Sequence, residues 1–100
     1  MANIRLNIME LTYTSYIKVD KLLELQEPKS SPVEHDEILF IIIHQTYELW
    51  FKQILHEIDY ARSLLSNADL YATIATFKRL RTIMKTLVGQ MDILETMTPR

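Results

Sequence analysis

Residues 32–66 decide the fold, and they read PVEHDEILFIIIHQTYELWFKQILHEIDYARSLLS. After Pro32 this stretch contains no proline and no glycine, and its many Leu, Ile, Glu and Gln residues favour a helix. Ser31 offers an N-cap hydroxyl, Pro32 suits the first helical position, and Glu34 completes a capping box. The sequence therefore predicts a long helix over residues 32–66, on the order of 50 Å in length.

The apolar residues of this predicted helix cover more than one stripe of its surface. A simple surface helix would show a single stripe facing its core. The helix should therefore pack against more than one partner surface, and its apolar residues are Ile38, Leu39, Ile41, Ile42, Leu49, Trp50, Ile54, Leu55 and Ile58.

A second long helix is predicted over residues 69–96, with Asp69 as its N-cap. Its apolar residues recur every three or four positions, as in an amphipathic helix: Leu70, Ile74, Phe77, Leu80, Met84, Leu87, Met91 and Leu94. Residues 16–26 predict a short first helix that the stretch around Pro28 closes. Residues 1–15 lack a helical period and predict an extended arm. The expected fold is all-α: an arm, a short helix and two long antiparallel helices in one module over residues 1–100.

Composition excludes several functional classes. The formal net charge is −2, so no overall field would draw the chain to nucleic acid or to an anionic membrane. The absence of cysteine excludes disulfides, thiolate metal sites and a cysteine nucleophile, and it suits a reducing, cytoplasmic setting. The longest apolar run, residues 38–43, is too short to span a bilayer.

A basic run on the second long helix comprises Lys78, Arg79, Arg81 and Lys85. Nucleic-acid binding would favour aromatic residues among these cations and a more basic chain. The run is therefore interpreted as a solvated helix face.

The three histidines do not predict a metal site. On an ideal helix His35 and His44 point about 180° apart, while His44 and His56 lie about 18 Å apart. A di-iron motif would require glutamate three residues before His44 or His56, and those positions hold Ile41 and Gln53. For His35 and His56 the simpler interpretation is a hydrogen-bonded structural residue.

His44 differs because Phe40 lies one turn before it and shares its helix face. An aromatic wall beside an imidazole suits a pocket for an aromatic ligand that carries an N–H group. Filled cores are more common than such pockets, so spacing alone leaves both interpretations open.

The string HDEILFIIIHQTYELWFKQI, residues 35–54, resembles the signature of the tryptophan 2,3-dioxygenases. Two further segments resemble the same family: LTYTSY at residues 11–16, followed by Leu22 and Leu23, and ILETMTP at residues 93–99. The resemblance covers about ninety residues, which is more specific than a short motif.

The resemblance implies a heme enzyme that inserts both atoms of dioxygen into L-tryptophan and forms N-formyl-L-kynurenine. At matching positions, His44 resembles the catalytic-pocket histidine that faces the indole N–H, and Phe40 resembles the aromatic residue that packs on the substrate. Tyr13, Tyr16 and Ile17 resemble arm residues that reach a neighbouring subunit's pocket in a homotetramer. Because the indole N–H is a very weak acid, His44 is expected to position the substrate by a hydrogen bond.

Two parts of the family's site have no match in this sequence. The arginine that grips the substrate carboxylate would follow Arg100, and none of the three histidines aligns with the proximal heme ligand. We therefore expect these 100 residues alone to be inactive. The alternative is a noncatalytic helical module that assembles through its arm and the surplus apolar face of the long helix.

Overall fold

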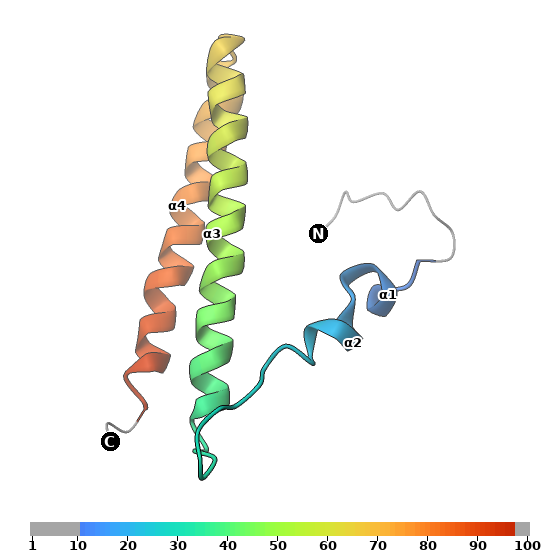
Figure 1. Ribbon diagram of the computed structural model, residues 1–100. Coiled ribbons are helices and arrows are strands. Elements are labelled where there is room, and N and C mark those ends of the chain that lie inside the picture. The colour runs from blue at the N-terminus through green and yellow to red at the C-terminus, as the bar shows by residue number, and fades with distance from the viewer. Residues whose placement is uncertain (1–10, 98–100) are drawn as a thin grey trace.

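The computed structural model of the chain describes residues 11–97, and every regular element in that range is a helix. The all-α prediction is confirmed. Two short helices, α1 (Tyr13–Ile17) and α2 (Val19–Leu22), precede two long ones, α3 (Glu37–Ser66) and α4 (Leu70–Leu94). The long helices form an antiparallel hairpin, and α1 and α2 stand beside it (Figure 1).

Three residues, Asn67, Ala68 and Asp69, link the two long helices. The backbone N–H of Asp69 donates to Leu64 O at 2.9 Å, and the N–H of Ala68 donates to Leu65 O at 3.0 Å, which ends α3 in a Schellman motif. Ala68 takes the left-handed conformation (φ 57°) that this motif usually gives to glycine. The Asp69 carboxylate then accepts from the N–H of Ala72 at 3.2 Å. The predicted N-cap is therefore confirmed, and the same residue also closes the preceding helix.

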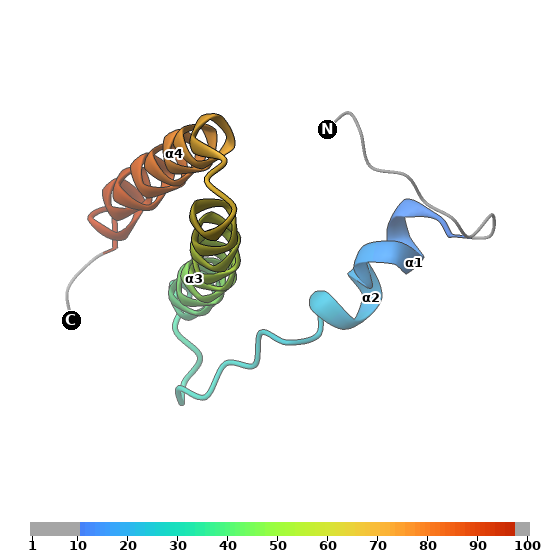
Figure 2. The same ribbon diagram turned by 90° about the horizontal axis from the view of Figure 1, so that it is seen from above.

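The hairpin has a small core between its helices. The buried apolar side chains are Ile43, Ala61, Leu64, Ile83 and Leu87. Thr73 and Thr76 are also buried, and their hydroxyls donate to carbonyls one turn earlier in α4, at 2.7 and 2.9 Å. The two helices lie closest together at the turn and diverge toward their other ends (Figures 1 and 2).

The observed start of α3 differs from the predicted capping box at Ser31. The helix begins at Glu37, and its N-cap, Asp36, makes no side-chain capping bond. Ser30, and not the predicted Ser31, supplies the hydroxyl that bonds this region. The Ser30 hydroxyl accepts from the N–H of Glu34 at 3.0 Å and donates to the Glu37 carboxylate. That carboxylate also accepts from the N–H groups of Lys29 and Ser30, at 2.7 and 3.0 Å. Residues 29–36 thus form a loop folded around Glu37 rather than the first turns of the helix.

The N-terminal segment also differs from its prediction. Residues 16–26 do not form one helix, because Lys18 adopts a left-handed conformation that separates α1 from α2. Part of the predicted arm is helical, since Thr12 and Ser15 form a capping box that starts α1 at Tyr13. Residues 1–10 of the predicted arm lie outside the described residues.

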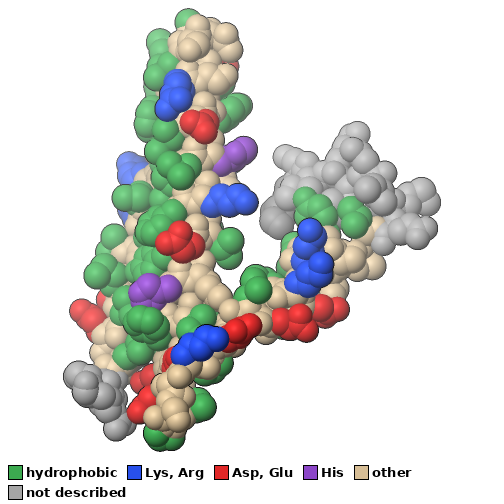
Figure 3. All heavy atoms as spheres, viewed as in Figure 1, with side chains coloured by type: hydrophobic (Ala, Val, Ile, Leu, Met, Phe, Trp, Pro, Cys, Tyr) green, Lys and Arg blue, Asp and Glu red, His purple; other side chains and the backbone are tan. Residues whose placement is uncertain are grey.

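The chain is extended for its length. Its radius of gyration is 18.0 Å, whereas a compact domain of this size would have about 13 Å. Large apolar side chains remain exposed along both sides of the hairpin, and Figure 3 shows many of them on one face. No helix within residues 11–97 is long and apolar enough to cross a membrane.

Candidate functional site

Phe40 and His44 lie together on the same face of α3. Their ring centroids are 4.3 Å apart, with an angle of 38° between the planes, and both side chains are exposed. His44 Nδ1 is 2.8 Å from the carbonyl oxygen of Phe40. Since a carbonyl can only accept, Nδ1 carries the hydrogen, and in the neutral imidazole Nε2 is left as an acceptor. The site therefore combines an aromatic face with a hydrogen-bond acceptor.

A hollow of about 410 Å³ opens beside His44, between the parts of α3 and α4 that lie away from the turn. Tyr47 supports its wall: its hydroxyl donates to Leu87 O at 2.9 Å, and its ring stacks on Phe51 at 6.0 Å. The lining is mostly apolar and consists of His44, Tyr47, Glu48, Phe51, Leu87, Val88, Met91 and Leu94. The hollow can accept a flat apolar group and offers it few polar partners, of which the imidazole is one.

His44 also borders a second hollow, of about 540 Å³, on an adjacent face of α3. Here residues from the segment that follows α2 face the long helix, and the lining is Leu22, Leu25, His44, Gln45, Glu48, Leu49 and Lys52. The histidine thus lies where the N-terminal segment meets the hairpin.

The three arm residues predicted for the site are not brought to His44 within this chain. Tyr13, Tyr16 and Ile17 lie on α1 and are 77%, 48% and 40% exposed. Among the described helices α1 contacts only α2. Their large exposed side chains are free to meet another surface, so their place in a pocket stays a prediction.

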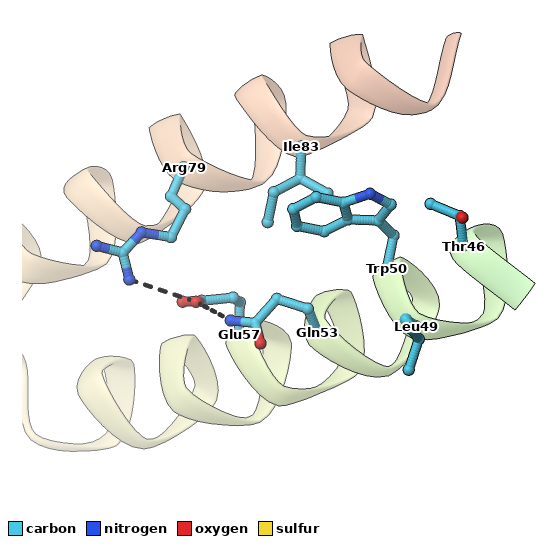
Figure 4. A pocket seen from close by; sticks show the side chains of 7 residues that line it. All are labelled: Thr46, Leu49, Trp50, Gln53, Glu57, Arg79 and Ile83. Atoms are coloured by element: carbon cyan, nitrogen blue, oxygen red, sulfur yellow. Dashed lines mark hydrogen bonds and ion pairs between the residues drawn. The ribbon is translucent and has the colours of Figure 1, made fainter. Parts of the chain in front are cut away.

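A third hollow, of about 620 Å³, lies elsewhere on the hairpin and was missed by the sequence analysis. At one end Glu57, only 3% exposed, accepts from Gln53 Nε2 at 2.6 Å and from Arg79 Nη1 at 3.3 Å (Figure 4). Trp50 and Ile83 form apolar walls between the two helices (Figure 4).

Arg79 therefore departs from the solvated face predicted for the basic run. Its guanidinium pairs across the hairpin with a buried carboxylate, although 68% of its side chain is exposed. Lys78, Arg81 and Lys85 are exposed, as predicted. No local sequence signal marks this pair, because its two members lie on different helices.

The histidines do not cluster. Within residues 11–97, no three His, Asp or Glu side chains come close enough to hold a metal ion. His35 and His56 are exposed, and the structure places neither against Phe40 and His44. The hydrogen bond of His44 goes to a backbone carbonyl.

Glu37 carries the clearest electrostatic perturbation of the described residues. The N–H of Lys29, followed by the hydroxyl and N–H of Ser30, donates to its carboxylate and holds the pKa of Glu37 below its usual range. Partial desolvation opposes this shift and is outweighed. The charge of Glu37 thus fastens the loop before α3, close to the site.

The model of a known family, described as tryptophan 2,3-dioxygenase, matches residues 2–100. The chain belongs to the tryptophan 2,3-dioxygenase family. A tryptophan 2,3-dioxygenase of Herpetosiphon aurantiacus is 58% identical over 89 residues, which are 89% of this chain and 34% of that protein. One of Anaeromyxobacter sp. (strain K) is 53% identical over 90% of this chain and 33% of its own length. A tryptophan 2,3-dioxygenase of Dictyostelium discoideum is 52% identical over 86% of this chain and 24% of its own length. The chain spans about a third or less of these family members.

Proposed function

We propose that the chain supplies the distal side of the substrate pocket in a heme-dependent L-tryptophan 2,3-dioxygenase. The reaction joins L-tryptophan and dioxygen to give N-formyl-L-kynurenine. The observation that carries the proposal is the hydrogen bond from His44 Nδ1 to Phe40 O, which leaves Nε2 as an acceptor beside an aromatic ring and an apolar hollow. An indole has the complementary groups, a flat apolar ring system and a single N–H donor.

In this proposal His44 is the catalytic-pocket residue that orients the substrate. Nε2 accepts the hydrogen bond of the indole N–H, and Phe40 packs against the ring. The imidazole does not need to remove the indole proton, because that proton is far too weakly acidic for a neutral histidine. The apolar walls at Leu87, Val88 and Met91 keep water from the bound ring.

The described residues fit a heme only in part. The hollow beside His44 offers apolar surface of the kind a porphyrin needs, but its one histidine is already assigned to the indole N–H. A bound heme supplies the iron chemistry that activates dioxygen. This chain's contribution is to bind and orient tryptophan, and the proximal ligand and the substrate-carboxylate arginine are assigned to the additional length of the family members.

Tyr13, Tyr16 and Ile17 are proposed to complete the pocket of a second copy in a homotetramer. Their exposure on a short helix that makes no helix contact with its own hairpin supports this role. Burying three such side chains against another copy would contribute a few kcal/mol each at most, by analogy with core burial.

A chimeric enzyme provides the test. The matching third of the Herpetosiphon aurantiacus relative would be replaced by residues 12–100, and N-formylkynurenine formation would be followed by absorbance with heme present. We expect turnover, and a fall in kcat/KM of roughly tenfold in His44→Ala, because one ligand hydrogen bond is lost. His56→Ala is the matched control and should leave kcat/KM unchanged. A chimera in which His44→Ala and His56→Ala behave alike would contradict the proposal.

A helical interaction module without catalysis is the second candidate, and the exposed apolar sides of the hairpin favour it. It requires self-association of the 100-residue chain. Sedimentation as a monomer at micromolar concentration would count against it.

A further inference from the structure

The side chains of Gln26 and Gln45 form a reciprocal amide clamp between the N-terminal segment and α3. Gln26 Nε2 donates to Gln45 Oε1 at 2.9 Å and also to Leu22 O at 2.9 Å. Gln45 Nε2 donates to Leu25 O at 2.9 Å. The Gln45 amide thus bonds both the Gln26 side chain and the Leu25 carbonyl across the junction, while Gln26 also bonds the carbonyl of Leu22 at the end of α2.

A second anchor fastens the same segment farther along. The Glu37 carboxylate accepts from Lys29 and Ser30, as described above. Glu37 and Gln45 are eight residues apart on one helix, or about 12 Å along its axis. Two points this far apart fix both the position and the direction of the segment that they hold.

The direction of α1 depends on this junction. Neither α1 nor α2 makes helix-to-helix contacts with α3 or α4 in the described range. Figures 1 and 2 both show the two short helices set apart from the hairpin, joined to it by the segment that the clamp holds. Gln45 is also the residue directly after His44, so the clamp lies at the rim of the hollow that His44 shares with Leu22 and Leu25.

We propose that Gln26 and Gln45 are positioning residues, whose amide clamp aims α1 away from its own hairpin so that Tyr13, Tyr16 and Ile17 can reach the His44 hollow of a second copy. The inference rests on the proposed function and adds the device that sets the geometry of the exchange. Two hydrogen bonds cross the junction at Gln45, one partly buried and one exposed, so removing its amide should raise the population of released segments by roughly tenfold.

Pulsed electron paramagnetic resonance can measure the direction of α1 in the 100-residue chain. The sequence has no cysteine, so Thr14→Cys and Ser63→Cys place one spin label on α1 and one on α3, both at exposed positions. We expect a narrow distance distribution in the parent chain and loss of that narrow distribution in Gln45→Ala. Gln26→Ala should broaden it as well, and this variant lies outside the hairpin, so it cannot act by unfolding α3 or α4.

Gln90→Ala is the matched control, because it removes the same side chain from a half-exposed position on α4. It should leave the distribution narrow. A distribution that stays the same in Gln45→Ala and Gln26→Ala, or that is already broad in the parent chain, overturns the inference. Failure of the proposed function would show differently, as a chimera whose turnover does not depend on His44.

Discussion

The two ends of the α3–α4 hairpin differ in which side chains they bury. At the turn, Ala61, Leu64, Thr73 and Thr76 are buried, and both threonine hydroxyls are hydrogen-bonded. At the other end, Phe40, Phe51 and Met91 are exposed around His44 and its hollow. The turn end also exposes apolar side chains, among them Leu65, Leu70 and Tyr71, but the hollow that His44 lines lies at the open end. The two ends thus differ in how the buried core and the His44 hollow are distributed.

The largest expected effect on stability comes from Leu64→Ala at the turn end. Leu64 is 9% exposed and Leu65, its neighbour, is 52% exposed. Truncating Leu64 should lower the free energy of unfolding by about 2–4 kcal/mol, because it leaves a cavity in a small core. Leu65→Ala should cost less than about 1 kcal/mol. Urea denaturation followed by circular dichroism measures both, and equal losses would contradict the assignment of Leu64 to the core at the turn end.

Between the ends, the ion pair of Arg79 with Glu57 should have an intermediate effect. Arg79→Met keeps most of the side-chain bulk but leaves the buried carboxylate with only Gln53 as a recorded donor. We expect a loss of about 1 kcal/mol, reduced by the exposure of the arginine. Arg81→Met, on the exposed face, should change the stability by less than about 0.5 kcal/mol. Indistinguishable denaturation midpoints for these two variants would show that the pair does not stabilise the hairpin.

Ala68→Gly should stabilise the turn between α3 and α4. The left-handed conformation of Ala68 (φ 57°) strains a residue that has a Cβ atom. Replacing it with glycine should raise the free energy of unfolding by about 0.5–1 kcal/mol. We expect a higher melting temperature. Ala75→Gly, on the exposed face of α4, should lower it by a comparable free energy because glycine weakens a helix interior. A fall in both variants would mean that the strain at Ala68 is negligible.

The smallest effect concerns pH at the open end. Because the pKa of Glu37 is lower in the folded than in the unfolded chain, its stabilisation is complete above the unfolded pKa. It is lost as the pH falls through the folded pKa. The amide proton shifts of Lys29 and Ser30 should therefore titrate with a midpoint below the ordinary pKa of a glutamate side chain. Glu37→Gln should abolish this titration, and a midpoint at or above the ordinary value would exclude the anchor.

Local signals in the sequence predicted much of this architecture. Helix formers and apolar spacing predicted the hairpin, Asp69 was predicted as an N-cap, and the four-residue spacing placed Phe40 beside His44. The predicted start of α3 was wrong, because the predicted capping box between Ser31 and Glu34 does not form. Instead, the Ser30 hydroxyl donates to the Glu37 carboxylate and accepts from the N–H of Glu34.

What the sequence could not provide were contacts between distant segments. Arg79 and Glu57 are 22 residues apart, and Gln26 and Gln45 are 19 apart. Neither pair follows from a helical period, because each depends on how two separate elements meet. The bond from His44 to Phe40 O is local, yet it depends on the side-chain rotamer and not on residue type.

Asp69 both ends α3 and caps α4, and this double role limits changes in the length of the turn. All three linking residues, Asn67, Ala68 and Asp69, donate backbone hydrogen bonds to α3, so an extra residue there would break this set of bonds. An insertion there would turn α4 by about 100° about its own axis. Ile83 and Leu87 would then face away from α3, and the wall that Leu87 gives to the His44 hollow would rotate with them. The length of this turn is therefore constrained by a cavity at the far end of the helices.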